Sequence, residues 1–254
     1  MLLFILGKQC ASSKHCCPFC TGSSPWLGTF SPVTVGSLWD NYTAFQEAGA
    51  PIKKAQLYKN VVNQPLVTGS NEKKILGDLV FFPEHHVFTG IVGKLVKELE
   101  RKVFDSQEEG VSFMNQWMKE PGINVIRTVY HGSASFIGNQ AERLLSKVDL
   151  LEIKLEKTVK SPEKLSLAKL FIKALKQFND VTHSCFGQNL LPNYPEHIIE
   201  FMETYRALNI TIPVKVHLLE THAIEFLKIM GEEHGLGFYS EQAMESMHHD
   251  LLEE

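Results

Sequence analysis

The sequence has no long hydrophobic run, and this absence argues against a membrane-spanning helix. The apolar opening, Met1–Leu6, is six residues long and has no basic residue before it. A membrane span needs about 20 apolar residues. A secretory signal needs roughly 7–15 behind a positive flank. We therefore expect no membrane partner and no secretion, and we place the protein in the nucleus or the cytoplasm.

A surplus of basic residues is also missing. Lys and Arg number 25 against 29 Asp and Glu, a net charge of -4. Strong duplex-DNA binders usually carry a basic surplus, so we expect DNA binding to be weak or confined to a full-length context. A nuclease core stays open, because catalytic faces are acidic. With 254 residues, 44% hydrophobic and 21% charged, the chain has the composition of one large or two small globular domains.

Cysteine is scarce, but four of the five cysteines fall within residues 10–20. Such clustering indicates a metal site in a reducing compartment rather than a disulfide framework. Cys17 and Cys20 are two residues apart and offer two thiolates from one tight turn. Zinc prefers four such ligands in a tetrahedron, so a structural zinc ion needs a second pair from elsewhere in the chain.

The best second pair is His217 and His222, whose spacing falls within the range of zinc knuckles. On a regular helix, positions five apart point roughly 140° from each other. Both imidazoles can bind one ion only if the segment changes conformation between them. The plainer alternative is two buried thiols and two histidines on a polar face. A zinc hydrolase is disfavoured, because its helical histidine pair has three intervening residues and this pair has four.

A second candidate site lies in the last expected helix, 241–254. Glu241, Glu245 and His248 recur at helical spacing and share one face. Carboxylates held in this way can bind divalent cations for two-metal phosphoryl transfer. The alternative is a solvated acidic stripe beside an apolar one.

Hydrophobic periodicity predicts a mainly α protein. Val87, Ile91, Leu95 and Leu99 mark the clearest helix, and Ser161-Pro162-Glu163 is a strong helix start. Ser37 is the expected cap of the first long helix. We expect helices at 37–49, 84–104, 107–119, 135–158, 161–178, 194–209, 214–230 and 241–254, a turn of helix around Lys54–Val62, and one short strand at Ile123–Val129.

Several short phrases occur in an order that resembles the C-terminal catalytic part of transposases from animal DNA transposons, distantly similar to the CACTA-type group. The phrases are Ser13-Lys14-His15-Cys16-Cys17-Pro18-Phe19-Cys20, Pro83-Glu84-His85-His86-Val87-Phe88-Thr89-Gly90-Ile91-Val92, Tyr130-His131-Gly132, Gly138-Asn139, Val216-His217-Leu218-Leu219-Glu220-Thr221-His222, and Leu236-Gly237-Phe238-Tyr239-Ser240-Glu241-Gln242-Ala243-Met244-Glu245. Together they span nearly the whole chain.

The resemblance implies the C-terminal fragment of an RNase H-like α/β core of the DDE type with a large helical insertion. It implies a metal-dependent core that cuts and joins DNA strands, in which three acids hold two magnesium ions and a zinc element braces the fold. Glu245 matches the last acid, with Glu241 as the near alternative. The metal or bracing positions match Cys17, Cys20, His86, His217 and His222.

On this interpretation the chain divides into four segments: a cysteine knuckle region at 1–35, a helical core segment at 36–120, the helical insertion at 121–212 and the catalytic-helix segment at 213–254.

In this family the first two acids precede the knuckle, yet none of the sixteen residues before Cys17 is Asp or Glu. We therefore expect a truncated transposase-like protein that is inactive alone, with Mg²⁺ only in a complete parent enzyme and self-association as one option. The alternative is a zinc-stabilised helical module that binds protein or nucleic acid without catalysis.

Overall fold

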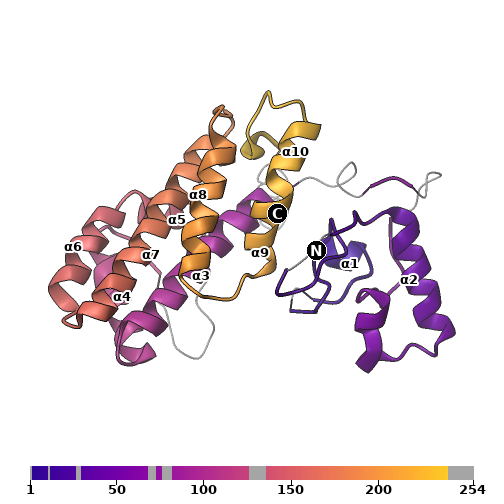
Figure 1. The fold of residues 1–254 in the computed structure, drawn as a ribbon, viewed down its shortest axis with the longest axis horizontal. Coiled ribbons are helices and arrows are strands. Elements are labelled where there is room, and N and C mark those ends of the chain that lie inside the picture. Colours follow the sequence, from indigo (N-terminus) through magenta and orange to yellow (C-terminus); the bar gives the residue numbers. More distant parts are fainter. Residues whose placement is uncertain are drawn as a thin grey trace, which may run out of the picture. The chain divides into compact units, whose positions relative to one another are not determined.

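The chain is described from a computed structural model over residues 2–10, 12–26, 30–67, 73–75, 82–125 and 136–239. Helices dominate these residues (Figure 1). Three isolated β-bridges, Lys8–Val61, Cys20–Pro32 and Thr34–Ile75, are the only β-pairings among them. The mainly α class is confirmed, whereas the RNase H-like core stays a prediction. None of the described helices combines the length and the apolarity needed to cross a membrane.

The chain forms two compact units, and their segments alternate along the sequence. Unit one comprises residues 1–82 and 211–229, and unit two comprises residues 83–210 and 230–254. Unit one is therefore built from two segments separated by more than a hundred residues. The second unit begins at Pro83, inside the segment 36–120 of the sequence prediction.

Unit one contains short helices around a small apolar core. Its core consists of Leu6, Val33, Val35, Leu38 and Val61, with Trp39, Tyr42 and Val67 packed against it. The elements are α1 (Leu2–Ile5), α2 (Val35–Glu47), the 3₁₀ helix η1 (Ile52–Tyr58), α9 (Val214–His217), the π-helical segment η4 (Leu218–Ala223) and α10 (Ile224–Ile229).

Helix α2 begins earlier than the sequence suggested. The N-cap is Thr34, whose Oγ1 accepts a hydrogen bond from the Ser37 backbone N–H at 3.1 Å. The Ser37 hydroxyl in turn accepts one from the Thr34 N–H at 3.0 Å. This reciprocal capping box satisfies two backbone donors at once, so Ser37 lies inside the helix rather than capping it.

Unit two is a helical bundle in which α7 packs against α3, α6 and α8. Helices α7 and α8 run side by side, as Figure 1 shows. Buried aromatic rings fill its centre, and the ring centroids of Phe178 and Phe201 are 5.1 Å apart. The elements are α3 (Glu84–Val103), α4 (Gln107–Lys119), α5 (Gly138–Leu145), α6 (Val148–Thr158), α7 (Pro162–Val181), the π-helical segment η3 (Thr182–Phe186), α8 (Tyr194–Ala207) and the 3₁₀ helix η5 (Leu236–Tyr239).

Two expected elements differ from the structure. The single helix expected at 135–158 is two helices, because the chain leaves helical geometry at Lys147 (φ -118°, ψ 17°) and α6 packs along α7. The expected strand at 123–129 is absent over residues 123–125, where the Val125 N–H bonds back to the Ile123 carbonyl in a tight turn. Residues 126–135 and 240–254 lie outside the described part, so the expected terminal helix stays a prediction.

Candidate metal centre

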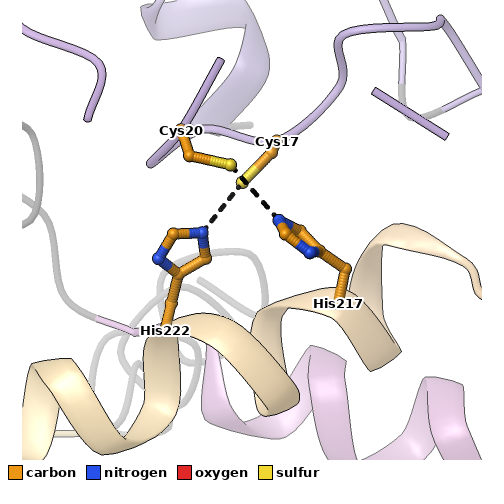
Figure 2. A group of neighbouring side chains, drawn as sticks. All are labelled: Cys17, Cys20, His217 and His222. Carbon is orange, nitrogen blue, oxygen red and sulfur yellow. Dashed lines mark hydrogen bonds between the residues drawn. The ribbon is translucent and has the colours of Figure 1, made fainter. Parts of the chain in front are cut away.

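Four side chains from the two segments of unit one converge on one point. They are Cys17, Cys20, His217 and His222, all buried, and their ligand atoms all lie within 4.8 Å of one another (Figure 2). Cys20 Sγ is 3.3 Å from His217 Nε2, and Cys17 Sγ is 3.5 Å from His222 Nε2. The structure thus brings together both pairs that the sequence singled out as zinc ligands.

Backbone interactions hold the cysteine turn in place. The buried Lys8 side chain donates hydrogen bonds from Nζ to the carbonyl oxygens of Cys17 at 2.6 Å and His15 at 3.2 Å. The Gly22 backbone N–H lies 3.4 Å from Cys20 Sγ and donates to it. These contacts orient the loop so that both sulfur atoms point toward the histidines.

A change of helix pitch brings the two histidines together. Segment η4 is π-helical, and its i→i+5 bonding widens the turn directly after His217. Residues five apart then approach the same side of the helix, which a regular α-helix forbids. The imidazole centroids of His217 and His222 are consequently 5.2 Å apart. The π-helical turn therefore lets both imidazoles face one ion, which a spacing of five residues on a regular α-helix would not allow.

The second nitrogen of each imidazole faces a polar side chain. His217 Nδ1 lies 3.2 Å from Thr221 Oγ1, and His222 Nδ1 lies 3.7 Å from a carboxylate oxygen of Glu225. Trp26 stacks on the His217 ring at a centroid distance of 4.0 Å. Outer contacts of this kind fix the ring orientation of metal-binding histidines. Both Nε2 atoms are left directed at the sulfur atoms.

The two thiols share one buried environment and interact with each other. Burial raises the pKa of Cys17, and a hydrogen bond from the Cys17 thiol lowers the pKa of Cys20, assisted by the two histidines. Burial also lowers the pKa of the nearby Lys8, although the cysteines oppose this shift. A divalent cation between the sulfur atoms would favour the thiolate form of both cysteines.

The donor set fits a tetrahedral metal ion. Zn–S bonds of about 2.3 Å and Zn–N bonds of about 2.0–2.1 Å at tetrahedral angles imply S···N separations of about 3.5 Å, close to the observed 3.3 and 3.5 Å. The group can therefore hold a metal ion and is compatible with structural zinc. When all four side chains bind, no coordination position is open, and an open position is what distinguishes catalytic zinc sites.

Among the described residues, no further predicted site residue joins this group. His86 is exposed on α3 in unit two and is not a member of the ligand group. Glu241, Glu245 and His248 lie outside the described residues, so their roles stay predictions. Sequence reasoning missed Lys8 and Trp26, which no motif marks. Thr221 stands four residues after His217, and that helical spacing was a usable signal.

Comparison with known proteins adds no assignment: neither a family model nor a curated protein matches this chain.

Proposed function

We propose that this chain is the zinc-braced C-terminal part of a DDE-type transposase-like protein, and that it does not cut DNA by itself. The observation that supports the proposal most is the Cys₂His₂ group, which joins residues 17–20 to residues 217–222. Zinc is the ion that best suits two thiolates and two imidazoles.

The order of elements supports the transposase-like interpretation. The resemblance implies a cysteine knuckle, a helical insertion, a histidine pair and then the last acid, at Glu245 or Glu241. Residues 83–210 of unit two lie between the cysteine and histidine segments of unit one and are mainly helical where the structure describes them, and residues 230–254 of unit two follow the histidine pair. The helical stretch before the histidine pair agrees with an insertion that precedes the last acid. An RNase H-like core in the complete parent protein is part of this proposal.

The metal-ligand group of the described residues does not suit two-metal strand cleavage. The described residues contain one group of potential metal ligands, and it is made of sulfur and nitrogen. Two-metal phosphoryl transfer uses magnesium, which prefers oxygen ligands. We therefore assign Mg²⁺ and strong DNA binding to a complete parent enzyme, and we place the protein in the nucleus or cytoplasm.

A second candidate is a zinc-stabilised module that binds protein or nucleic acid without chemistry. The buried, four-ligand site favours it, because such sites usually stabilise folds. The genomic sequence upstream discriminates between the two. A reading frame that continues into two further acids favours a transposase fragment, and a promoter with a genuine start codon favours the module.

Metal analysis of the purified protein tests the zinc site. We expect one zinc per chain, lost when Cys17→Ser and Cys20→Ser are combined, because thiolates supply half of the ligands. The control is Cys10→Ser, since Cys10 is exposed and outside the ligand group. A folded, metal-free wild-type protein would contradict the zinc site.

Incubation with Mg²⁺ and end-labelled DNA tests the predicted inactivity. We expect no strand cleavage by the purified chain, whether or not zinc is bound. Robust Mg²⁺-dependent cleavage, abolished by Glu245→Gln, would overturn the claim of inactivity and support a complete catalytic site in this chain.

A further inference from the structure

Unit two contains a cavity of about 780 Å³ that none of the preceding chemistry uses. The first turn of α3, helix α5, the end of α7 and segment η3 surround it. Among its lining residues are Glu84, Phe88, Arg143, Lys147, Asn179 and Phe186. Its size is typical of a pocket for a small organic ligand.

Glu84 is the unusual group in this cavity. Its exposed fraction is 7%, and no hydrogen bond to its carboxyl group occurs within the described part of the chain. Glu84 lines the cavity, so a ligand in the cavity can reach its carboxyl group. A carboxyl group that lines a cavity without a hydrogen-bond partner on the described chain is available to a ligand with complementary polar atoms.

The protonation state of Glu84 indicates which hydrogen-bonding groups the ligand must present. Burial, reinforced by the negative charge of Glu142, raises the pKa of Glu84 to about 7. The neutral form is thus populated near neutral pH, and it carries an O–H donor beside a carbonyl acceptor. The complementary ligand presents an acceptor beside a donor.

The remaining lining is mixed: polar side chains and the exposed carboxylate of Glu142 accompany two buried phenylalanine rings and two exposed cations. The buried rings of Phe88 and Phe186 have centroids 6.2 Å apart and form an apolar surface. Arg143 and Lys147 are exposed, and Arg143 is oriented by a 2.9 Å hydrogen bond from its Nη1 to the Gly122 carbonyl. An anionic group at the rim would meet these two cations.

Segment η3 contributes one wall, and π-helical turns often occur at functional sites. Gly138 also lines the cavity, and a Cβ there would come within 2.9 Å of the His85 ring, so a larger residue at this position would disturb the wall.

We propose that this cavity binds a single nucleotide with an adenine or cytosine base, and that Glu84 reads its Watson–Crick edge. Adenine N1 with N6–H₂, and cytosine N3 with N4–H₂, each place an acceptor beside a donor. The base lies against Phe88 and Phe186, and its phosphate meets Arg143 and Lys147. This inference goes beyond the proposed function and does not depend on the zinc site, which belongs to unit one.

Two sources share this chemistry: a free mononucleotide, and one unstacked nucleotide of a single strand. Titration calorimetry at fixed salt distinguishes them with AMP, CMP and UMP in one arm, and short oligo(dA), oligo(dC) and oligo(dT) in the other. Binding of AMP or CMP alone identifies a free nucleotide as the ligand, and binding of the A or C oligonucleotides alone identifies a strand. No binding of any probe up to about 1 mM, or equal binding of UMP or oligo(dT), overturns the proposal.

Variants of Glu84 test the reading of the base. Glu84→Ala removes both polar atoms, so we expect binding at least about tenfold weaker, in the range lost with one bidentate base contact. Glu84→Gln keeps a donor beside an acceptor and should bind as wild type. The control, Glu163→Gln, changes an exposed glutamate outside the cavity and should have no effect.

Unchanged binding by Glu84→Ala, or loss of binding by a correctly folded Glu84→Gln, contradicts the proposal. Zinc content measured on the same samples reports on unit one separately. A failure of nucleotide binding with zinc retained therefore leaves the proposed function intact, and the reverse result leaves the nucleotide site intact.

Discussion

Each histidine of the metal centre turns one ring nitrogen toward the thiols and the other toward a polar side chain. For His217 the outer partner is the Thr221 hydroxyl at 3.2 Å, and Trp26 covers the ring face. For His222 the partner is Glu225 at 3.7 Å, a longer contact whose carboxylate is largely exposed. Thr221 therefore fixes its imidazole more firmly than Glu225 does.

We expect Thr221→Val to weaken zinc binding about tenfold to a hundredfold, the usual cost of losing an outer hydrogen bond to a ligating histidine. The side chain keeps its volume, so the fold should persist. Competition with a chromophoric chelator measures the affinity. The matched control is Thr43→Val, at an exposed position on α2. Equal zinc affinity of wild type and Thr221→Val would show that the hydroxyl does not orient His217.

Glu84 gives unit two a pH-dependent stability of defined sign. Its pKa is about 7 in the folded chain against an ordinary value of 4.5. Between these values the folded state holds a proton that the unfolded state releases, so stability falls as pH rises through this window. At about 1.4 kcal/mol for each pH unit, the loss amounts to at most about 3.5 kcal/mol.

We expect Glu84→Gln to remove this dependence, because an amide does not titrate. The melting temperature of the variant relative to wild type should therefore rise between pH 5 and pH 8. Thermal melts monitored by circular dichroism at several pH values measure it. The control, Glu163→Gln, should keep the wild-type pH profile. A temperature difference that does not change with pH would show that Glu84 ionises normally in the fold.

At the scale of elements, caps and irregular turns matter more than helix propensity. Helix α2 begins at the Thr34–Ser37 capping box, and η4 supplies the wide turn between the histidines. Both features are local departures from a regular helix. They decide where unit one starts its longest helix and where its metal ligands point.

We expect Thr34→Ala to lower the free energy of unfolding by about 1 kcal/mol, the usual cost of removing a threonine N-cap. Denaturant unfolding followed through the unit-one tryptophans, Trp26 and Trp39, measures the change. Thr43→Ala makes the same substitution in the exposed middle of α2 and should not destabilise the protein, because alanine favours helices. Equal stability of wild type and Thr34→Ala would argue against the capping box.

At the scale of the whole molecule, the metal centre connects two segments that the sequence holds far apart. Unit one consists of residues 1–82 and 211–229, and the ligands come two from each segment. Its apolar core is small, whereas unit two has a large aromatic core of its own. Metal binding contributes folding free energy where the core alone is insufficient.

We therefore expect zinc chelation to unfold unit one selectively. Hydrogen–deuterium exchange with mass spectrometry should show lost protection in α2, α9 and α10, with α3, α7 and α8 still protected, because unit two holds no ligand of this group. The Cys17→Ser/Cys20→Ser variant should show the same pattern without chelator. Unchanged protection in unit one after zinc removal would show that the ion does not stabilise it.

Local signals in the sequence were enough to predict the helical class, most helix bounds of unit two and the four candidate metal ligands. Apolar residues at helical spacing and prolines at helix starts are local signals, so α3, α4 and α8 lie close to their predicted ranges. Cysteine spacing is local too, which is why Cys17 and Cys20 were identifiable.

Packing between remote segments is what brings distant groups together. The meeting of the cysteine and histidine pairs, the stacking of Trp26 on His217 and the burial of Glu84 beside a cavity all depend on it. The partners of the two short helices depend on it too, since α5 packs mainly against α3 and α6 against α7. Periodicity reports which face of a helix is apolar, but it carries no information on which partner that face will find.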